Sequence, residues 1–453
     1  MDQETIVAIA TASGPGGVGI VRLSGDKALA IGSTITSLQL QPRYAHYCSF
    51  YDSTGHALDF GISLFFPGPH SFTGEDVVEL QAHGGPVILD LLLRESCRLG
   101  ARQAQPGEFS QRAYLNDKID LTQAEAIADL INSTTEQAAI NASRSLQGVF
   151  SKKIELLIAQ VTRLRVYIEA AIDFPEEEID FIEDGQVEEK LQDIVMQFTS
   201  IAEEARQGSL LQEGMKLVIA GKPNAGKSSL LNALSGHDRA IVTPIEGTTR
   251  DVLREHIQID GMPLHIVDTA GLRDSSNEIE QEGIRRAWAE MESSDRILLV
   301  VDGSALPRGS IDPSNLWPEK NIHLSHDIPI TLIHNKCDLD DRPPGIFQDH
   351  DLTMIDLSAK TGAGMELLKE HLKTCMGYTK DSESSFSARR RHLEALAKAE
   401  SFLSDGKKQL RSGAGELLAE DLRQCQNCLG EITGAISSDE LLGEIFSNFC
   451  IGK

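Results

Sequence analysis

Few features of this chain are those of secreted or membrane proteins. Its seven cysteines are an odd number scattered over 453 residues, a usage that fits reduced thiols rather than a disulfide framework. No apolar run approaches the roughly 18 residues needed to cross a bilayer, and the opening Met-Asp-Gln-Glu lacks the basic start of a signal peptide. We therefore expect a cytoplasmic protein that makes no contact with a membrane.

Positive charge is also scarce. The chain has 42 lysines and arginines against 68 aspartates and glutamates, a net charge of −26, which excludes a broad basic surface for nucleic acid. Any contact with RNA must therefore be local. The clearest basic cluster, residues 389–392, opens a helix-like segment, where a solvated face or pairing with carboxylates is the commoner arrangement.

Metal-ligand patterns are missing too. Cys425 and Cys428 have the spacing of half a zinc site, but no second pair and no histidine accompany them. On a helix their two sulfurs share one face, so packing is the favoured role. An apolar content of 41% with 24% charged residues is typical of a globular chain, and the length suits about three domains.

What the chain does contain is a phosphate-binding loop, Gly-Lys-Pro-Asn-Ala-Gly-Lys-Ser at residues 221–228. It lies between a strand-like apolar run at 216–220 and a helix-like run at 229–234, which is the context the motif requires. The glycines let successive backbone N–H groups and the helix N-terminus face the phosphates. Lys227 reaches the terminal phosphates and Ser228 ligates Mg²⁺, so a nucleoside triphosphate site is predicted.

Two further segments point to the γ-phosphate and the metal. Asp-Thr-Ala-Gly at 268–271 ends an apolar run, where a carboxylate holds the Mg²⁺ shell and a glycine N–H senses the γ-phosphate. Gly-Thr-Thr-Arg-Asp at 247–251 is a polar loop between the two motifs. We assign Thr249 of this loop as the second side-chain ligand of Mg²⁺.

The base is predicted to be guanine. Asn-Lys-Cys-Asp at 335–338 follows an apolar strand, and Asp338 there accepts from the two donors on the guanine edge. Ser-Ala-Lys at 358–360 closes another strand and suits backbone contact with the guanine oxygen. Each short match is weak alone, but five in order, each at the carboxyl end of a predicted strand, are specific. The residues assigned to the GTP site are Asn224, Ala225, Gly226, Lys227, Ser228, Ser229, Thr243, Thr249, Asp268, Thr269, Ala270, Gly271, Asn335, Lys336, Asp338, Ser358, Ala359 and Lys360.

The glutamine that orients the attacking water in many GTPases is absent, because Leu272 follows the Asp-Thr-Ala-Gly segment. One interpretation is a switch that does not hydrolyse GTP. The other is a replacement within the acidic segment 278–282, although any single glutamate there could simply favour a helix N-terminus. The amide oxygen of Asn224 could hold a monovalent cation against the phosphates, supplying charge that an arginine finger supplies elsewhere.

The rest of the chain divides around this segment. Residues 1–118 alternate short strands with turns, and the Gly-rich stretch 14–19 precedes a strand rather than a helix, so a hairpin loop is favoured over a dinucleotide cradle. Helical periodicity covers 119–212 and returns in 379–453, with a break at Pro175. The GTPase segment, 213–378, therefore interrupts a helical domain. The strands are expected at 5–12, 19–24, 45–51, 59–66 and 76–82, and the last helices at 390–403, 415–436 and 438–446.

Four features together carry a resemblance over essentially all 453 residues. They are the segment 14–25, the Asn-Asp-Lys of 116–118 followed by Asp-Leu, the inserted GTPase with its Gly-Thr-Thr-Arg-Asp, and the terminal Cys-Ile-Gly-Lys at 450–453. On these the chain resembles the tRNA-modification GTPase family called MnmE or TrmE. The implied fold is α/β and α+β multidomain: an N-terminal folate-binding-like α+β domain and a helical bundle domain interrupted by an inserted Ras-like P-loop GTPase domain.

The resemblance implies a homodimer formed through the N-terminal domain and a bound 5-formyl-tetrahydrofolate-type one-carbon donor. Arg22, Glu79, Lys118 and Lys453 match the family's folate contacts; the cations suit folate carboxylates, and Glu79 suits the pterin donors. For any one of them, an ordinary ion pair is the alternative. Cys450 is expected either to take part in chemistry or to pack.

The resemblance also implies activation by K⁺, which Asn224, Thr243, Ile245 and Thr248 would bind. Glu280 matches the family's water-orienting glutamate, so the expected catalytic residues are Glu280, Lys227 and Cys450. With an FAD-containing partner of the MnmG type, such proteins add a carboxymethylaminomethyl or aminomethyl-type group to C5 of the wobble uridine of certain tRNAs.

Two other functions remain open. A ribosome-assembly GTPase of the related Era type would carry a basic RNA-binding module after the GTPase segment, where this chain has acidic helices. A nucleotide-gated scaffold would use the folate-like domain only as a platform for dimerisation. The residues alone leave open which tRNAs are modified and whether glycine or ammonium supplies the amine.

Overall fold

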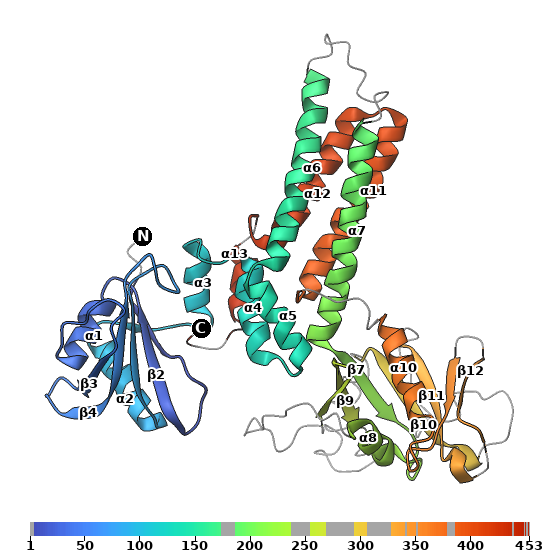
Figure 1. Cartoon of the computed structure of the whole chain (residues 1–453), viewed down its shortest axis with the longest axis horizontal. Coiled ribbons are helices and arrows are strands. Elements are labelled where there is room, and N and C mark those ends of the chain that lie inside the picture. Colours follow the sequence, from blue (N-terminus) through green and yellow to red (C-terminus); the bar gives the residue numbers. More distant parts are fainter. Residues whose placement is uncertain are drawn as a thin grey trace, which may run out of the picture. The chain divides into compact units, whose positions relative to one another are not determined.

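The structure is a computed structural model of the whole chain (Figure 1). It describes residues 4–173, 186–236, 254–268, 294–305, 328–339, 342–349, 352–377, 386–436, 439–447, 449 and 452. The chain forms two compact units. The first contains Met1–Ala128, Ser145–Leu191 and Lys398–Lys453, and the second contains Asp129–Arg144 and Gln192–Ala397.

The N-terminal part of the first unit is a six-stranded sheet with two helices on one face (Figure 1). Its strands are β1 (Ile6–Ile9), β2 (Gly16–Ser24), β3 (His46–Tyr51), β4 (Ala57–Phe66), β5 (Val77–Gly84) and β6 (Arg102–Gln103). Their order is β3-β4-β5-β2-β1-β6, and only the β1–β6 pair is parallel. The helices α1 (Ala28–Thr36) and α2 (Pro86–Arg98) bury one apolar core with this sheet. The opposite face carries Arg22 and Glu79, which are directly paired on β2 and β5.

The predicted hairpin at the glycine-rich segment is confirmed. β1 and β2 pair antiparallel, with Ile9 opposite Val21, so the glycines lead into a strand and form no dinucleotide cradle. β1 is shorter than the predicted 5–12, and β2 begins three residues earlier than predicted, because a register irregularity between Gly16 and Gly19 extends its pairing with β5.

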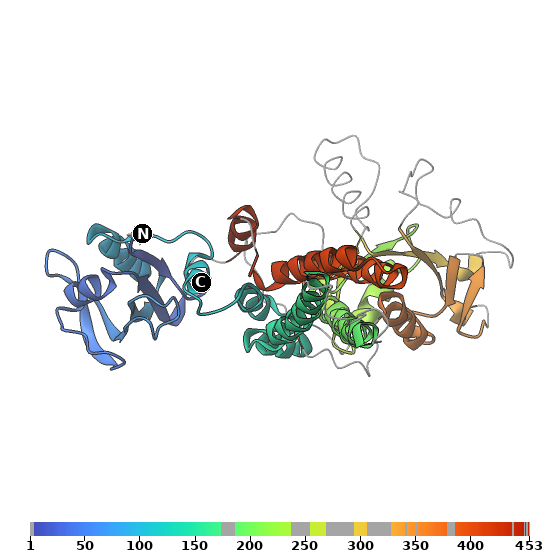
Figure 2. The same ribbon diagram turned by 90° about the horizontal axis from the view of Figure 1, so that it is seen from above.

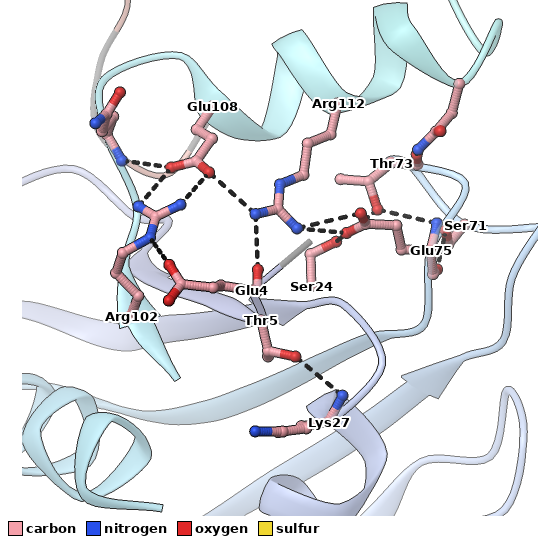
Figure 3. A network of polar contacts seen from close by, with 12 residues as sticks. Glu4, Thr5, Ser24, Lys27, Ser71, Thr73, Glu75, Arg102, Glu108 and Arg112 are labelled. Atoms are coloured by element: carbon pink, nitrogen blue, oxygen red, sulfur yellow. Dashed lines mark hydrogen bonds and ion pairs between the residues drawn. The ribbon is translucent and has the colours of Figure 1, made fainter. Parts of the chain in front are cut away.

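A network of buried charges attaches α3 (Glu108–Leu115) to the sheet, as Figure 3 shows. Arg112 donates to Glu75 at 2.9 and 3.1 Å, to Glu108 at 3.0 Å and to the carbonyl oxygen of Glu4 at 2.8 Å. Arg102 approaches Glu108 from its other side, at 2.6 Å. Only 5% of the Arg112 side chain is exposed, so the Arg112 guanidinium neutralises the largely buried carboxylate of Glu75 and shares that of Glu108 with Arg102.

In the described part of the chain, seven helices belong to neither of the two sheet-containing domains. They are α4 (Leu121–Asn132), α5 (Glu136–Leu146), α6 (Val149–Asp173), α7 (Gln186–Glu213), α11 (Arg390–Ser412), α12 (Gly415–Thr433) and α13 (Asp439–Ser447). Within the first unit, α6 and α12 run side by side (Figures 1 and 2). Among the described residues, no helix is both long and apolar enough to cross a membrane.

The structure corrects one helix boundary that was predicted from periodicity. α6 is described up to Asp173, and the predicted break at Pro175 lies outside the described residues. α12 ends at Thr433 rather than at the predicted residue 436, because Gly434 adopts a left-handed conformation, φ +83°. Cys425 and Cys428 are buried on α12, as expected of packing residues, and burial raises the pKa of Cys425 to about 12. A thiol with that pKa is unreactive at neutral pH.

The second unit contains a seven-stranded sheet (Figure 1). Its strands are β7 (Met215–Ala220), β8 (Arg254–Ile259), β9 (Met262–Asp268), β10 (Arg296–Asp302), β11 (Ile330–Asn335), β12 (Gly345–Asp349) and β13 (Leu352–Asp356). The order is β12-β13-β11-β10-β7-β9-β8, with the five inner strands parallel and the two edges antiparallel. Central strands of a parallel sheet are buried on both faces, which explains the unbroken apolar runs of β7 and β10.

Two helices position the motifs on this sheet. α8 (Lys227–Ser235) and α10 (Met365–Met376) contribute Leu230, Leu234, Leu368 and Leu372 to one core on one face of the sheet. β7 begins two residues after α7 ends, and α11 begins after the last element of the sheet domain. The predicted fold class, a P-loop domain inserted into a helical one, is therefore confirmed.

Candidate functional site

The phosphate loop connects β7 to α8 and depends on two glycines. Gly221 has φ +148°, and a Cβ there would lie 2.1 Å from the carbonyl oxygen of Val300 on β10. Gly226, with φ +98°, precedes α8 as its N-cap, and a Cβ there would lie 2.1 Å from the side-chain nitrogen of Asn335. Any other residue would displace the loop, which brings its N–H groups and the N-terminus of α8 to one anion site.

Lys227 holds this loop in shape. Its Nζ donates to the carbonyl oxygens of Gly221 at 2.7 Å and Lys222 at 3.2 Å. Ser228 and Ser229 are exposed on the first turn of α8, and Asn224 is exposed in a left-handed conformation with φ +64°. An asparagine tolerates that conformation, so its amide can be presented beside the loop. These four residues, Asn224, Lys227, Ser228 and Ser229, lie where the predicted phosphate, Mg²⁺ and K⁺ roles require them.

Asn335 joins the phosphate loop to both base-recognition segments. Its amide nitrogen donates to the carbonyl oxygen of Ala225 at 2.9 Å, and its amide oxygen accepts from the N–H of Ala359 at 3.0 Å. The side chain is buried, so both bonds lie in a low-dielectric setting. Three segments from widely separated parts of the sequence thus share one centre at the carboxyl edge of the sheet.

The other predicted base contacts surround this centre. Asp338 is exposed in a 3₁₀ turn, Cys337–Leu339, directly after β11. Ser358 is buried after β13, where its hydroxyl accepts from the N–H of Thr361 at 3.2 Å, and Lys360 is exposed beside it. Lys336 also follows β11, and its ammonium lies 2.6 Å from Asp302. The motifs lie at the carboxyl ends of the parallel strands, near the point where the strand order of the sheet reverses. Ligands of such sheets usually bind at this switch point.

Sequence reasoning missed a buried pair beneath the base site. His334 Nδ1 lies 2.8 Å from Asp356 Oδ1, and both side chains are about nine-tenths buried. The pair ties β11 to β13 immediately before Asn335 and Leu357, so it fixes the spacing of the two base-recognition segments. The available signal was a histidine and an aspartate near the carboxyl ends of two largely apolar strands.

Several assigned residues lie outside the described part of the chain. The backbone of Asp268 is described as the last residue of β9, next to Ile219 on β7, close to the phosphate loop. The predictions that fall outside the described residues are those for Thr243, Ile245, Thr248, Thr249, Thr269, Ala270, Gly271, Leu272, Glu280, Cys450 and Lys453.

A second candidate site lies on the N-terminal sheet. Arg22 and Glu79 form an ion pair of 2.9 Å, and each has less than a quarter of its side chain exposed. The guanidinium carbon lies 6.0 Å from the ring centre of Phe72 and 5.9 Å from that of Phe109. Arg22, Glu79 and Phe72 border a cavity of about 350 Å³, which is also lined by Phe66, Val77, Ile127 and Leu146. One cation and one anion among apolar walls suit a ligand with an aromatic body and charged groups.

The C-terminal tail reaches this site. The carbonyl oxygen of Gly452 accepts from Arg22 Nη1 at 3.4 Å. Gly452 has φ +96°, and a Cβ there would lie 2.3 Å from the carbonyl oxygen of Ile9, so only glycine fits against β1. Lys118 is exposed, with its side chain packed beside Gly74. The structure thus brings together Arg22, Glu79 and the residue preceding Lys453, and places Lys118 next to the loop that carries Phe72.

The geometry defines a P-loop GTPase whose nucleotide domain is inserted between helices and preceded by an α+β domain. A family model described as the MnmE helical domain matches residues 121–450, and one described as the GTP-binding protein TrmE N-terminus matches 5–118. The chain is 60% identical to the tRNA modification GTPase MnmE of Marinobacter nauticus, over 99% of both chains. It is 60% identical to that of Marinomonas sp. over 100% of this chain and 98% of the relative, and 58% identical to that of Vibrio cholerae over all of both.

The chain therefore belongs to the MnmE family of tRNA modification GTPases.

Proposed function

We propose that this chain hydrolyses GTP and uses the cycle to drive modification of C5 of the wobble uridine in certain tRNAs. The observation that carries the proposal is the Asn335 centre, which joins a phosphate loop to two guanine-recognition segments in a domain inserted between α7 and α11. Because α7 precedes the domain and α11 follows it, a conformational change at the nucleotide can be transmitted to helices at both ends of the domain.

Two ions fit the loop. Mg²⁺ would bind the hydroxyl of Ser228 at the start of α8, with Thr249 as its second side-chain ligand. K⁺ would bind the amide oxygen of Asn224 with Thr243, Ile245 and Thr248. When bound, these cations stabilise the negative charge that develops on the transferred phosphoryl group. Lys227, already held against the loop by Gly221, supplies a further fixed positive charge.

Glu280 is proposed to orient the attacking water, since Leu272 cannot. Glu280→Ala is expected to lower GTP turnover by about a hundredfold or more, the size of a lost general-base contribution. The Kd for GTP should stay within about threefold, because the residue would contact water rather than nucleotide. The measurement is phosphate release in single turnover with K⁺ present, beside a nucleotide titration. Glu282→Ala, in the same acidic segment, is the matched control; equal turnover in both variants contradicts the assignment.

The N-terminal cavity is proposed to hold a 5-formyl-tetrahydrofolate-type donor. Arg22 would pair with a ligand carboxylate, and the apolar walls formed by Phe66, Phe72 and Val77 suit a pterin ring. Lys118 and Lys453 would add positive charge at the rim. Glu79, which accepts from Arg22 and from Gln81 at 3.3 Å, is available to the pterin donors.

A homodimer through the N-terminal domain is supported by an exposed apolar strip on its outer strands. Tyr47 is 75% exposed, Phe60 54% and Ile62 38%, on the neighbouring strands β3 and β4. Contiguous exposed aromatic residues mark interaction surfaces more often than free surface. The tRNA and an FAD-containing protein of the MnmG type are the other proposed partners, and the partner would supply most of the tRNA affinity that this acidic chain lacks.

The test is wobble-nucleoside analysis of tRNA from a strain that lacks this gene, complemented with the wild type, Arg22→Ala or Arg94→Ala. Arg22→Ala should lose the modified nucleoside while retaining GTP hydrolysis, and its Kd for 5-formyl-tetrahydrofolate should rise about ten- to a hundredfold, as for a lost charged hydrogen bond. Arg94, exposed on α2, is the matched arginine control.

Each alternative gives a different result. Nucleosides unchanged by the deletion reject the proposal and favour a ribosome-assembly role of the Era type. If the deletion loses the modification and Arg22→Ala restores it as fully as the wild type does, the result favours a scaffold in which the cavity binds no donor.

A further inference from the structure

An ion pair at the end of β10 is not explained by any of the recognised GTPase motifs. Lys336 Nζ lies 2.6 Å from Asp302 Oδ2, and about two-thirds of each side chain is buried. Asp302 is the last residue of β10 and stands opposite Asn335 in the parallel pairing with β11. Its partner is the lysine of the base-recognition segment itself.

Asp302 is fixed independently of Lys336. Its other oxygen, Oδ1, accepts from the hydroxyl of Ser304 at 2.6 Å and from the N–H of Ser304 at 3.2 Å. The following residue, Gly303, is anchored through its carbonyl oxygen, which accepts from Arg342 at 2.7 Å. Hydrogen bonds from Lys336 and Ser304 lower the pKa of Asp302, which is therefore ionised at neutral pH. The carboxylate is thus a rigid receptor and not a mobile surface group.

The backbone conformation of Lys336 is one that its surroundings must stabilise. Its φ is +68°, a left-handed conformation that costs free energy in a residue other than glycine and persists only where the surroundings hold it. Asn335 anchors the segment to Ala225 and Ala359 on one side. The Asp302 contact supplies the third attachment, through the side chain with the most rotational freedom in the segment.

We propose that Asp302 is a positioning residue for guanine-nucleotide binding: it holds the ammonium of Lys336 at the end of β10, so that the lysine stem borders the base pocket before nucleotide arrives. Preordering one flexible side chain raises affinity by removing the entropy loss from the binding step. Asp302 acts through Lys336 and touches no nucleotide itself. Its loss therefore weakens binding chiefly by accelerating dissociation.

The experiment is a double-mutant cycle in the full-length chain, with Asp302→Asn, Lys336→Met and both together. Asparagine keeps the oxygen that accepts from Ser304, and methionine keeps most of the lysine stem. Dissociation of a fluorescent GDP analogue is measured by stopped flow. Asp302→Asn should accelerate dissociation about three- to tenfold, the effect of releasing one side chain. The double variant should match Lys336→Met alone, because the two residues act as one unit.

Glu366→Gln is the matched control, since it breaks a lysine pair of 2.8 Å on α10 away from the pocket. It should leave dissociation unchanged. Multiplicative effects of Asp302→Asn and Lys336→Met would show that Asp302 has a separate structural role and overturn the proposal. So would an unchanged rate in Asp302→Asn.

If Asp302→Asn fails to fold, the wild type and Lys336→Met still decide the question. Raising ionic strength with choline chloride, at constant K⁺, screens a partly exposed ion pair. It should accelerate dissociation from the wild type more than from Lys336→Met, because only the wild type has this ion pair in addition to the salt-sensitive phosphate contacts. An equal salt response in the two proteins rejects the proposal.

Discussion

Lys227→Ala is expected to abolish measurable GTP hydrolysis and to raise the Kd for GTP at least about a hundredfold, or about 2.7 kcal/mol. Two losses combine. The variant lacks the cation that meets the terminal phosphates, worth roughly 1.5–3 kcal/mol as a charged hydrogen bond. It also lacks the ammonium that bonds to the carbonyl oxygens of Gly221 and Lys222 and so holds the loop around its anion site.

Titration with a fluorescent GTP analogue and phosphate release measure the two effects of Lys227→Ala. Lys216→Ala is the control, because it removes an equal charge from an exposed position at the start of β7, the strand that precedes the loop. An affinity within threefold of the wild type for Lys227→Ala would mean that residues 221–228 do not form the phosphate site.

Arg112→Met is expected to destabilise the N-terminal domain by about 3–5 kcal/mol, the cost of leaving buried carboxylates without their partner. Glu75 would lose both hydrogen bonds that it accepts from an arginine, and Glu108 would lose one of three (Figure 3). The loop from Ser71 to Asp76, which places Phe72 beside Arg22, would lose its ion pair with α3 and, among the described residues, keep only the hydrogen bond from Asn116 to Thr73. Donor binding at the cavity should therefore weaken as well.

Hydrogen exchange of the β2 amides measures this stability without assuming that the whole chain unfolds in one step. Arg94→Met is the control: it breaks an ion pair of 2.7 Å with Asp90 in the same domain, but 74% of the Arg94 side chain and 43% of the Asp90 side chain are exposed. Its effect should stay within about 0.5 kcal/mol. Similar losses in both variants would show that burial of the network contributes nothing.

The same network predicts acid sensitivity. Burial alone would raise the pKa of Glu108, but hydrogen bonds from Arg102, the N–H of Gln105 and Arg112 outweigh burial and lower it from its ordinary 4.5. A carboxyl group with a lowered folded-state pKa stabilises the fold above its ordinary pKa, and that contribution is lost as pH falls below it. Protection of β2 should decline below about pH 4.5 in the wild type, and less steeply in Arg112→Met.

Local patterns correctly predicted the secondary structure that carries the described nucleotide motifs. The strand–loop–helix around Lys227, the turn after Asn335 and the segment at Ser358 each carry their conformation in a few neighbouring residues, through glycines, apolar runs and a helix start. Strands of a parallel sheet end at one edge, so knowing the strands was enough to expect the motifs together. Periodicity likewise placed the helices, although their ends depended on single backbone conformations such as that of Gly434.

Pairings between distant residues could not be predicted in this way. Asp302 and Lys336 are 34 positions apart, Glu75 and Arg112 are 37 apart, and Arg22 and Gly452 are 430 apart. Nothing in the local sequence distinguishes these residues from others on a solvated surface, because a single ion pair or hydrogen bond leaves no periodic pattern. Each depends on the register and packing of elements that meet only in the folded chain.

The chain's local sequence by itself thus determined that this is a GTPase whose nucleotide domain interrupts a helical one, and it predicted which segments bind the nucleotide. Only the tertiary structure decided which distant residues hold the two sites in place. Asn335 lies between two loops and Asp302 against Lys336, whereas Arg112 lies between two glutamates and Gly452 against β1. The reason is physical. Motifs encode local backbone shape and chemistry, whereas preorganisation comes from buried long-range contacts whose partners are chosen by the fold.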